Sequence, residues 1–269
     1  MKQIKLSDIS IATIDEGAGD TLLLVHGFPL NHTMWHEQIA VLSERYRVIA
    51  PDLRGFGRSV YSSASNTPAT LSMEQHADDL AALLDSLGIE GPVHFCGLSM
   101  GGYIAWQFWR RHGERVRSLL LCDTRPSADT EEAAQGRLAM ANRVLAAGNF
   151  FVSDAMLPKL VAPDHLREDS DVVSRIREMI SGTAPESIAA AQRGMAERID
   201  FTATLTDIDV PALVLVGEHD AITTAAEMRT IAEALPNGQF VEIPAAGHMA
   251  PMEEPAAVNA ALQDFLARL

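Results

Sequence analysis

The sequence has few cysteines, few aromatic residues and no long apolar run. Its two cysteines, Cys96 and Cys122, each lie within a short apolar stretch, so we expect small buried thiols and no disulfide. Neither a CxxC nor an HExxH pattern is present and the nine histidines are scattered, which predicts no metal site. No stretch approaches the roughly 20 apolar residues of a membrane-spanning helix. The first residues alternate polar and apolar types, unlike a secretory signal, and we expect a cytoplasmic protein.

Basic residues are also scarce relative to acidic ones. The chain has 21 Lys and Arg against 36 Asp and Glu, a net charge of −15. Such a surface repels the phosphates of nucleic acids and of anionic lipids, so we expect neither as a partner. The expected partner is a small-molecule substrate. At 269 residues the chain is long for one domain, and we expect one core that carries an insertion. The sequence does not indicate an oligomeric state.

Short apolar runs rich in β-branched residues alternate with stretches of helical spacing. The predicted strands cover residues 21–27, 46–53, 92–97, 116–123, 211–217 and 238–244, and the predicted helices cover 72–88, 102–112, 223–235 and 255–269. Strands that are apolar throughout are typical of a sheet with helices on both faces, and the alternation predicts a mostly parallel sheet. Ser72 and Gln75 fit a capping box, and Gly88 fits a helix stop. The first fifteen residues predict an antiparallel hairpin that turns near residues 7 and 8.

No strand pattern occurs between about residues 125 and 205. This segment is rich in Ala, Glu, Arg and Met and is interrupted by Pro158, Pro163 and Pro185. We predict that 125–205 forms a helical cap inserted into a core made of residues 1–124 and 206–269. Methionines at helical spacing are typical of core packing, and the alternative is that some of them line an adaptable apolar pocket. The polar stretch at 61–70 predicts a surface loop.

Residues 93–105, VHFCGLSMGGYIA, place a serine between glycines where a predicted strand meets a predicted helix. Gly97 and Gly101 lie two residues before and after Ser99, where the absence of a Cβ lets neighbouring backbone approach. This strand–turn–helix pattern is that of a nucleophile elbow, which exposes the serine hydroxyl above the sheet. The helix N-terminus adds free N–H donors at the position where an oxyanion would form. Ser99 is therefore the candidate nucleophile.

A serine nucleophile requires a general base, for which histidine is the natural choice. His248 lies in a loop flanked by glycine and proline after the last predicted strand, where it can reach the carboxyl edge of the sheet. His26 borders a turn glycine, and we expect it to brace its own loop. His94 lies within a strand and is expected to be buried or paired, and the remaining histidines lie at helix or loop positions. His248 is the candidate base.

Two aspartates compete for the role of the acid that orients this histidine. Asp220 lies in GEHD, in a loop just after a predicted strand, which gives the chain order Ser, Asp, His. Asp123 also follows a strand at the same edge, but it leads into the cap and could simply cap it. We favour Asp220 and retain Asp123 as the rival. For the oxyanion, the backbone N–H groups of Phe28 and Met100 are the candidate donors.

The motifs HGFP, DLRGFGRS, GLSMGG, GEHD and GHM together resemble the α/β-hydrolase superfamily, in its serine esterase and lactonase branch. That branch includes carboxylesterases, enol-lactonases and N-acyl homoserine lactonases. The resemblance runs from residue 21 to 269 and implies an α/β fold with an eight-stranded, mostly parallel sheet, a cap between strands 6 and 7, and no cofactor. It also implies a triad of Ser99, Asp220 and His248, with Phe28 and Met100 as oxyanion donors. DLRGFGRS lacks the Lys and Ser/Thr pair of a phosphate-binding loop and predicts a structural loop.

The pattern predicts a serine hydrolase that cleaves a carboxylic ester or lactone through an acyl-enzyme. A cap rich in Met and Leu favours a substrate with an apolar acyl part. Arg125, Arg137 and Arg143 could instead bind a substrate carboxylate, as an enol-lactonase needs, although exposed helix arginines are the other interpretation. Two alternatives remain: a cofactor-free perhydrolase or C–C bond hydrolase on the same triad, and a ligand-binding receptor that kept the fold and lost the chemistry. A lost triad residue is the usual sign of such a receptor, and all three are present here.

Overall fold

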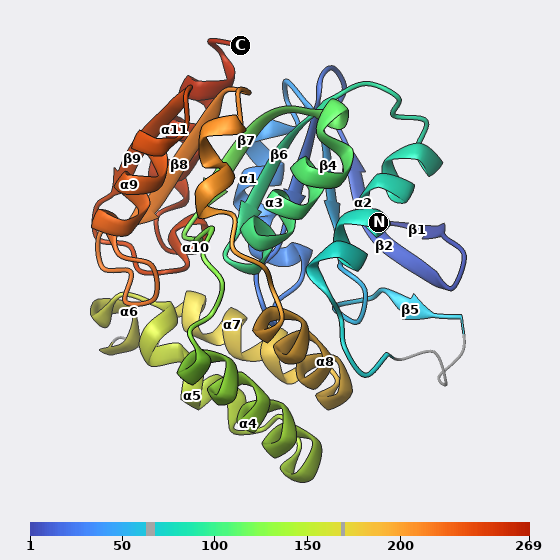
Figure 1. The fold of residues 1–269 in the computed structure, drawn as a ribbon, viewed down its shortest axis with the longest axis vertical. Coiled ribbons are helices and arrows are strands. Elements are labelled where there is room, and N and C mark those ends of the chain that lie inside the picture. The colour runs from blue at the N-terminus through green and yellow to red at the C-terminus, as the bar shows by residue number, and fades with distance from the viewer. Residues whose placement is uncertain (63–67, 168–169) are drawn as a thin grey trace.

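The apolar runs form the strands of one sheet in a computed structural model, which describes residues 1–62, 68–167 and 170–269 (Figure 1). The strands are β1 (Lys2–Lys5), β2 (Ile9–Glu16), β3 (Thr21–Val25), β4 (Arg47–Pro51), β5 (Val60–Tyr61), β6 (Val93–Leu98), β7 (Val116–Cys122), β8 (Ala212–Gly217) and β9 (Gly238–Ile243). Each predicted strand matches an observed one within two residues at either end. Half of the stretch predicted as a surface loop at 61–70, residues 63–67, lies outside the described residues.

Eight strands follow one another across the sheet in the order β1-β2-β4-β3-β6-β7-β8-β9, and the short β5 pairs with β2 as a ninth. The six strands from β3 onward that lie on this path are mutually parallel, whereas β1, β2 and β5 pair antiparallel. The predicted N-terminal hairpin is present as β1 and β2. The predicted mostly parallel sheet is confirmed, but the described residues form nine strands and not eight, because the short β5 pairs with β2.

Helices cover both faces of this sheet (Figure 1). The core helices are α1 (His36–Leu42), α2 (Met73–Ser86), α3 (Met100–His112), α9 (Ala225–Ala234), α10 (Ala250–Glu253) and α11 (Pro255–Leu266). Helix α1 packs with α11, and α2 packs with α3. The Ser72 side chain accepts from the N–H of Gln75 at 3.1 Å, and Gly88 has a φ of +67° just beyond α2. The Ser72 cap and the Gly88 stop are therefore confirmed, whereas the Gln75 side chain donates to Asp79 at 3.0 Å and does not provide the second half of the predicted capping box among the described residues.

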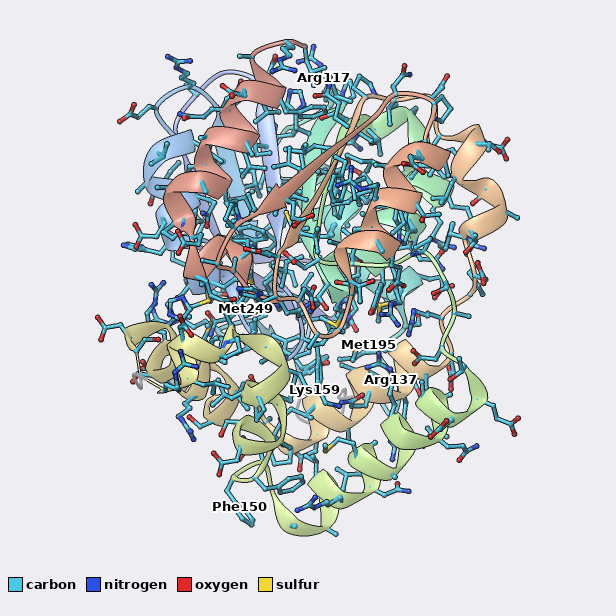
Figure 2. The ribbon with its side chains drawn as sticks, turned by 90° about the vertical axis from the view of Figure 1, so that its left-hand side faces the viewer. Arg117, Arg137, Phe150, Lys159, Met195 and Met249 are labelled. Carbon is cyan, nitrogen blue, oxygen red and sulfur yellow. The ribbon has the colours of Figure 1, made fainter. Side chains whose placement is uncertain are left out.

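The segment between β7 and β8 is a helical cap, at the bottom of Figure 1. Its helices are α4 (Glu131–Ala147), α5 (Val152–Leu160), α6 (Pro163–Arg167), α7 (Asp171–Ser181) and α8 (Pro185–Ala196). Without β5 in the count, the cap lies between the sixth and seventh strands, as expected. Figure 2 shows the cap below the core, with Phe150 at the end far from the core and Met249 near the boundary between the two. We keep 125–205 as the proposed extent of the cap.

The parallel register brings several strand ends to one edge of the sheet. Val25 of β3 pairs with Gly97 of β6, and Cys122 of β7 pairs with both Leu98 of β6 and Leu215 of β8. The loops that follow these strands therefore emerge side by side, and they carry the residues singled out above. Cys96 and Cys122 are buried and free of disulfide, as expected. No helix in the described part of the chain is long and apolar enough to cross a membrane.

The loops beside this edge are braced by buried polar residues. The N–H of Leu53 donates to Nε2 of His26 at 3.0 Å, and Nδ1 of the same ring lies 2.8 Å from the carbonyl of Gly27. Asp52 accepts from the N–H groups of His32 and Arg58 at 2.8 and 2.7 Å. His26 thus has the bracing contacts expected of it, and DLRGFGRS has those of a structural loop.

Three buried histidines should make stability depend on pH. Burial lowers the pKa of His26 and His94 to about 4 and that of His76 to about 3, because a charged imidazole would lose its hydration. A histidine whose pKa is lower in the folded than in the unfolded protein binds fewer protons in the folded state. Its contribution to stability is fully present above about pH 6.5, which is the pKa of histidine in the unfolded state. As the pH falls below this value, the free energy of unfolding decreases by up to about 1.4 kcal/mol per pH unit for each such histidine.

We therefore expect the free energy of unfolding to fall between pH 6.5 and 4.5, measured by urea denaturation. The His94→Asn variant should show a smaller fall, because Asn can still bond the Ser118 hydroxyl that lies 2.8 Å from Nδ1 of His94. The exposed His36→Asn variant is the matched control. A His94→Asn curve parallel to that of the wild type over this pH range would contradict the assignment.

Candidate active site

Ser99 occupies a strained turn between β6 and α3. Its backbone angles are φ 52° and ψ −109°, a left-handed conformation that non-glycine residues rarely adopt. A Cβ on Gly97 would lie 2.4 Å from the carbonyl carbon and oxygen of Gly101, and a Cβ on Gly101 would lie 2.3 Å from the carbonyl oxygen of Val25. Both glycines are therefore required sterically. The turn is further held by the Ser99 N–H, which donates to Cys122 O at 3.0 Å.

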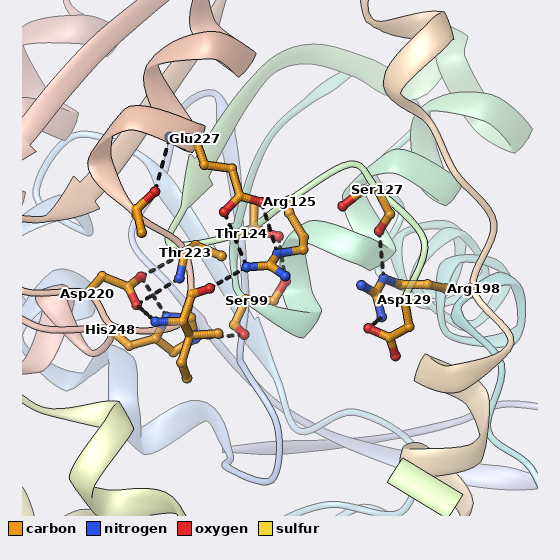
Figure 3. Close-up of polar contacts among 12 residues, drawn as sticks. Ser99, Thr124, Arg125, Ser127, Asp129, Arg198, Asp220, Thr223, Glu227 and His248 are labelled. Carbon is orange, nitrogen blue, oxygen red and sulfur yellow. Dashed lines mark hydrogen bonds and ion pairs between the residues drawn. The ribbon is translucent and has the colours of Figure 1, made fainter. Parts of the chain in front are cut away.

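The side chains of Ser99, His248 and Asp220 form one hydrogen-bonded chain (Figure 3). Nε2 of His248 lies 2.9 Å from Oγ of Ser99, and Nδ1 lies 2.8 Å from Oδ2 of Asp220. An ionised carboxylate only accepts, so Nδ1 carries the proton and Nε2 is left to accept from the serine hydroxyl. His248 and Asp220 are both buried. This is the orientation that a histidine needs to take a proton from a serine.

Asp220 is held as a carboxylate by its surroundings. Burial raises its pKa, but His248 and the donors of the following residues outweigh burial and lower it. Its Oδ1 accepts from the N–H groups of Ile222 and Thr223 at 2.7 and 3.0 Å, and the Thr223 hydroxyl donates to Oδ2. An ionised Asp220 favours the protonated form of a neighbouring imidazole through its negative charge.

Two backbone N–H groups are free to act on a substrate carbonyl oxygen. Within the described residues, neither the amide of Phe28 nor that of Met100 donates to a protein acceptor. Met100 is the first residue of α3, whose N-terminus carries partial positive charge. The loop of Phe28 passes beside the elbow, since a Cβ on Gly27 would lie 3.6 Å from Cβ of Ser99. The two amides expected to bind an oxyanion therefore come from the loop after β3 and from the first residue of α3.

The fold and this arrangement can be compared with known proteins. A model of the α/β hydrolase fold family matches residues 20–255. The chain belongs to this family. A solved structure of a thermophilic esterase from Thermogutta terrifontis, with malate bound, is 43% identical with a TM-score of 0.95 and covers 100% of this chain and 99% of that one. The enol-lactonase of Burkholderia xenovorans LB400 is 29% identical with a TM-score of 0.86, and covers 96% of this chain and 97% of that one.

Sequence comparison gives relatives of the same kind. The 3-oxoadipate enol-lactonase 2 of Acinetobacter baylyi is 27% identical over 261 residues, which are 97% of this hydrolase and 93% of that protein. The resemblance to the esterase and lactonase branch is thus confirmed, as is the expectation that the chain is an enzyme of the carboxylic ester hydrolase class. The roles of individual residues are not decided by these comparisons and stay predictions.

The rival aspartate of this α/β hydrolase lies beside the hydrogen-bonded chain but outside it. Asp123 is fully buried, and its Oδ1 accepts from the N–H of Gly217 at 2.9 Å, whereas its Oδ2 has no partner among the described residues. Burial and the nearby charge of Asp220 raise its pKa well above the usual range. Asp123 is therefore expected to be neutral where Asp220 is ionised.

Asp123, Asp220 and His248 also have ligand atoms within 4.8 Å of one another, the spacing at which such groups could hold a metal ion. Both nitrogens of His248 are already engaged, one with Asp220 and the other with Ser99. The arrangement is therefore better suited to proton transfer than to metal binding.

The three arginines considered as carboxylate ligands have partners within the protein. Arg125 donates to the carbonyl of Ile222 and pairs with Glu227, as Figure 3 shows. Arg137 pairs with Asp129 at 2.5 Å, and the guanidinium of Arg143 stacks over the ring of Phe151 at 3.7 Å. These contacts favour structural roles over substrate binding.

Three residues that support the site were missed by sequence reasoning. The Thr124 hydroxyl donates to the carbonyl of Ser99 at 2.8 Å, the Thr223 hydroxyl donates to Asp220, and the Glu253 carboxylate accepts from the amides on either side of His248. Thr124 and Thr223 follow the strand ends that carry Asp123 and Asp220, which is a usable signal. Glu253 stands next to a second glutamate, and nothing in the sequence distinguishes the two.

Proposed function

We propose that this hydrolase cleaves carboxylic esters or lactones with Ser99 as nucleophile, His248 as general base and Asp220 as the orienting acid. The observation that carries the proposal is the unbroken hydrogen-bonded chain from Oγ of Ser99 through His248 to Asp220. The strained backbone of Ser99 supports the same role, because such strain persists in folded proteins mainly where function uses it.

The proposed reaction has two halves. Nε2 of His248 takes the hydroxyl proton as Oγ of Ser99 bonds to the substrate carbonyl carbon, and the resulting oxyanion accepts from the amides of Phe28 and Met100. Collapse of this intermediate breaks the bond to the alkoxy oxygen, which receives the proton from His248, and leaves an acyl-serine. Water then attacks the acyl-serine with His248 again as base, and the acid is released. In a lactone the leaving oxygen stays tethered, so one hydroxy acid is the product.

An apolar acyl part is the preferred substrate feature. The cap meets the loop of His248 through α5, where the carbonyl of Leu160 accepts from the N–H of Met249 at 3.0 Å. Leu157, Leu160 and Val161 are buried in this region, and Met179 and Met195 are buried elsewhere in the cap. These buried apolar side chains of the cap support an apolar acyl part, and the contacts of Arg125, Arg137 and Arg143 within the protein give no support to a carboxylate.

A substrate panel combined with active-site labelling tests the proposal. We expect a fluorophosphonate to label the wild type at Ser99, and p-nitrophenyl esters and acyl homoserine lactones to be hydrolysed faster as the acyl chain lengthens. Peroxide-dependent halogenation in the absence of ester hydrolysis would favour the perhydrolase alternative, and turnover of a C–C substrate alone would favour the C–C hydrolase. A protein that is neither labelled nor active would fit the ligand-binding receptor.

A further inference from the structure

Glu253 lies where the cap meets the loop that carries His248. Its side chain comes from the last residue of α10 and is fully buried. Oε1 accepts from the N–H of Gly247 at 3.0 Å and from that of Met249 at 3.1 Å, which are the residues on either side of His248. Oε2 accepts from the N–H of Ala162, in the cap, at 2.7 Å. One carboxylate therefore bonds both the histidine loop and the cap.

The two backbone segments also touch directly. The carbonyl of Leu160 accepts from the N–H of Met249 at 3.0 Å. A Cβ on Gly247 would lie 2.6 Å from the backbone nitrogen of Ala162 and 2.7 Å from the carbonyl carbon of Val161, so the approach leaves no room for a side chain. We call the contact between residues 160–162 and 247–249 the cap–histidine seam. Glu253 closes this seam from the core side.

The electrostatics of Glu253 explain why it tolerates burial. Burial raises the pKa of its carboxyl, while the amides of Ala162, Gly247 and Met249 and the ring of His165, 3.9 Å from Oε2, favour the ionised form. A buried N–H without an acceptor costs about 1 to 3 kcal/mol. Loss of the carboxylate would leave the N–H groups of Ala162 and Gly247 without an acceptor and would leave that of Met249 with the Leu160 carbonyl alone, so the histidine loop would have to move to find other partners.

We propose that Glu253 is a positioning residue: it fixes the loop of His248 against the cap, so that the placement of the imidazole relative to Ser99 depends on how the cap is seated. This inference rests on the proposed role of His248 as base. Its consequence is that a substitution of Glu253 lowers kcat although, among the described residues, the Glu253 side chain bonds only backbone amides and makes no contact with Ser99. A displacement of about 1 Å of a reacting group is sufficient to cost roughly 100-fold in rate.

Glu253→Gln is the decisive variant. Gln has the same size, but it keeps one acceptor oxygen and places an NH₂ group where the other oxygen stood, so that donors face donors on one side of the seam. We expect kcat for a p-nitrophenyl ester to fall by about 10- to 100-fold, with KM changed less than threefold. Fluorophosphonate labelling of Ser99 should slow by a similar factor, because it too requires a correctly placed base.

Glu254→Gln is the matched control. Glu254 is adjacent and only partly buried, and its side chain makes no capping hydrogen bond to α11. We expect wild-type kcat from this variant. Gly247→Ala disturbs the same seam by steric conflict without removing the carboxylate, and it should also lower kcat while KM changes little.

Other outcomes would overturn the inference. A Glu253→Gln protein with a lower unfolding midpoint but wild-type kcat and labelling rate, measured where it is fully folded, would make Glu253 purely structural. If that variant does not fold, hydrogen exchange of the wild-type protein decides. The amide hydrogens of Ala162, Gly247 and Met249 should then exchange through one common opening, with the same free energy of opening. Different free energies of opening for the cap and for the histidine loop would refute the coupling. Failure of the proposed function looks different, since the wild type itself would resist the fluorophosphonate.

Discussion

Ser99→Ala should abolish ester hydrolysis, with kcat about 10⁶-fold below that of the wild type, the scale of loss seen when a serine hydrolase loses its nucleophile. The variant keeps His248 and the amides of Phe28 and Met100, but no group remains to form the acyl-enzyme. The measurement is kcat for a p-nitrophenyl ester, together with fluorophosphonate labelling followed by mass spectrometry. Labelling of Ser99→Ala at the wild-type rate would show that another residue is the nucleophile.

Ser99→Gly provides a matched comparison that isolates backbone strain. Both variants lack the hydroxyl, and both should be inactive. At the observed φ of 52° and ψ of −109°, however, Ala carries the same Cβ strain as Ser, whereas Gly does not. We expect Ser99→Gly to be more stable than Ser99→Ala by about 1 kcal/mol in urea unfolding. A glycine variant that is less stable than the alanine variant would show that this turn stores no strain.

Much of the fold could be predicted because its signals are local. The strands are continuous apolar runs, and Ser72 and Gly88 mark the ends of α2 by capping chemistry that requires no tertiary information. The glycines around Ser99 are also local signals, because each removes a steric conflict within a short turn or with the neighbouring strand. The order of strands and helices then placed the candidate residues at one edge of the sheet.

The remaining features depend on contacts between distant segments. Glu253 and Glu254 are identical residues in sequence, and only the approach of the cap to the histidine loop makes the first of them a bridge to Ala162, 91 positions away. The strand β5 has two residues, too short for a periodicity to be seen. The partners of Arg125, which are Ile222 and Glu227, likewise lie far along the chain, so the sequence left the role of this arginine open between substrate binding and structure.

The competition between Asp220 and Asp123 could not be decided from sequence because both follow strands at the same edge. In the structure they differ in partners. Asp220 accepts hydrogen bonds from Nδ1 of His248 and from two backbone N–H groups. Asp123 accepts from the N–H of Gly217 and has no hydrogen bond to His248. Burial and the charge of Asp220 outweigh the single Gly217 donor and raise the pKa of Asp123, whereas the partners of Asp220 lower the pKa of Asp220. The two carboxyl groups should therefore respond differently to the same substitution.

Asp220→Asn should lower kcat by about 10⁴-fold, the loss that accompanies the wrong histidine tautomer in a triad. The Asn amide can present its NH₂ group to Nδ1, which moves the imidazole proton to Nε2, where it can no longer accept from Ser99. Asp123→Asn replaces a neutral acid with a neutral amide that can still accept from Gly217. It should change kcat by less than about threefold, since no charge is lost. Equal kcat values for Asp220→Asn and the wild type, with a large loss in Asp123→Asn, would transfer the role of the acid to Asp123.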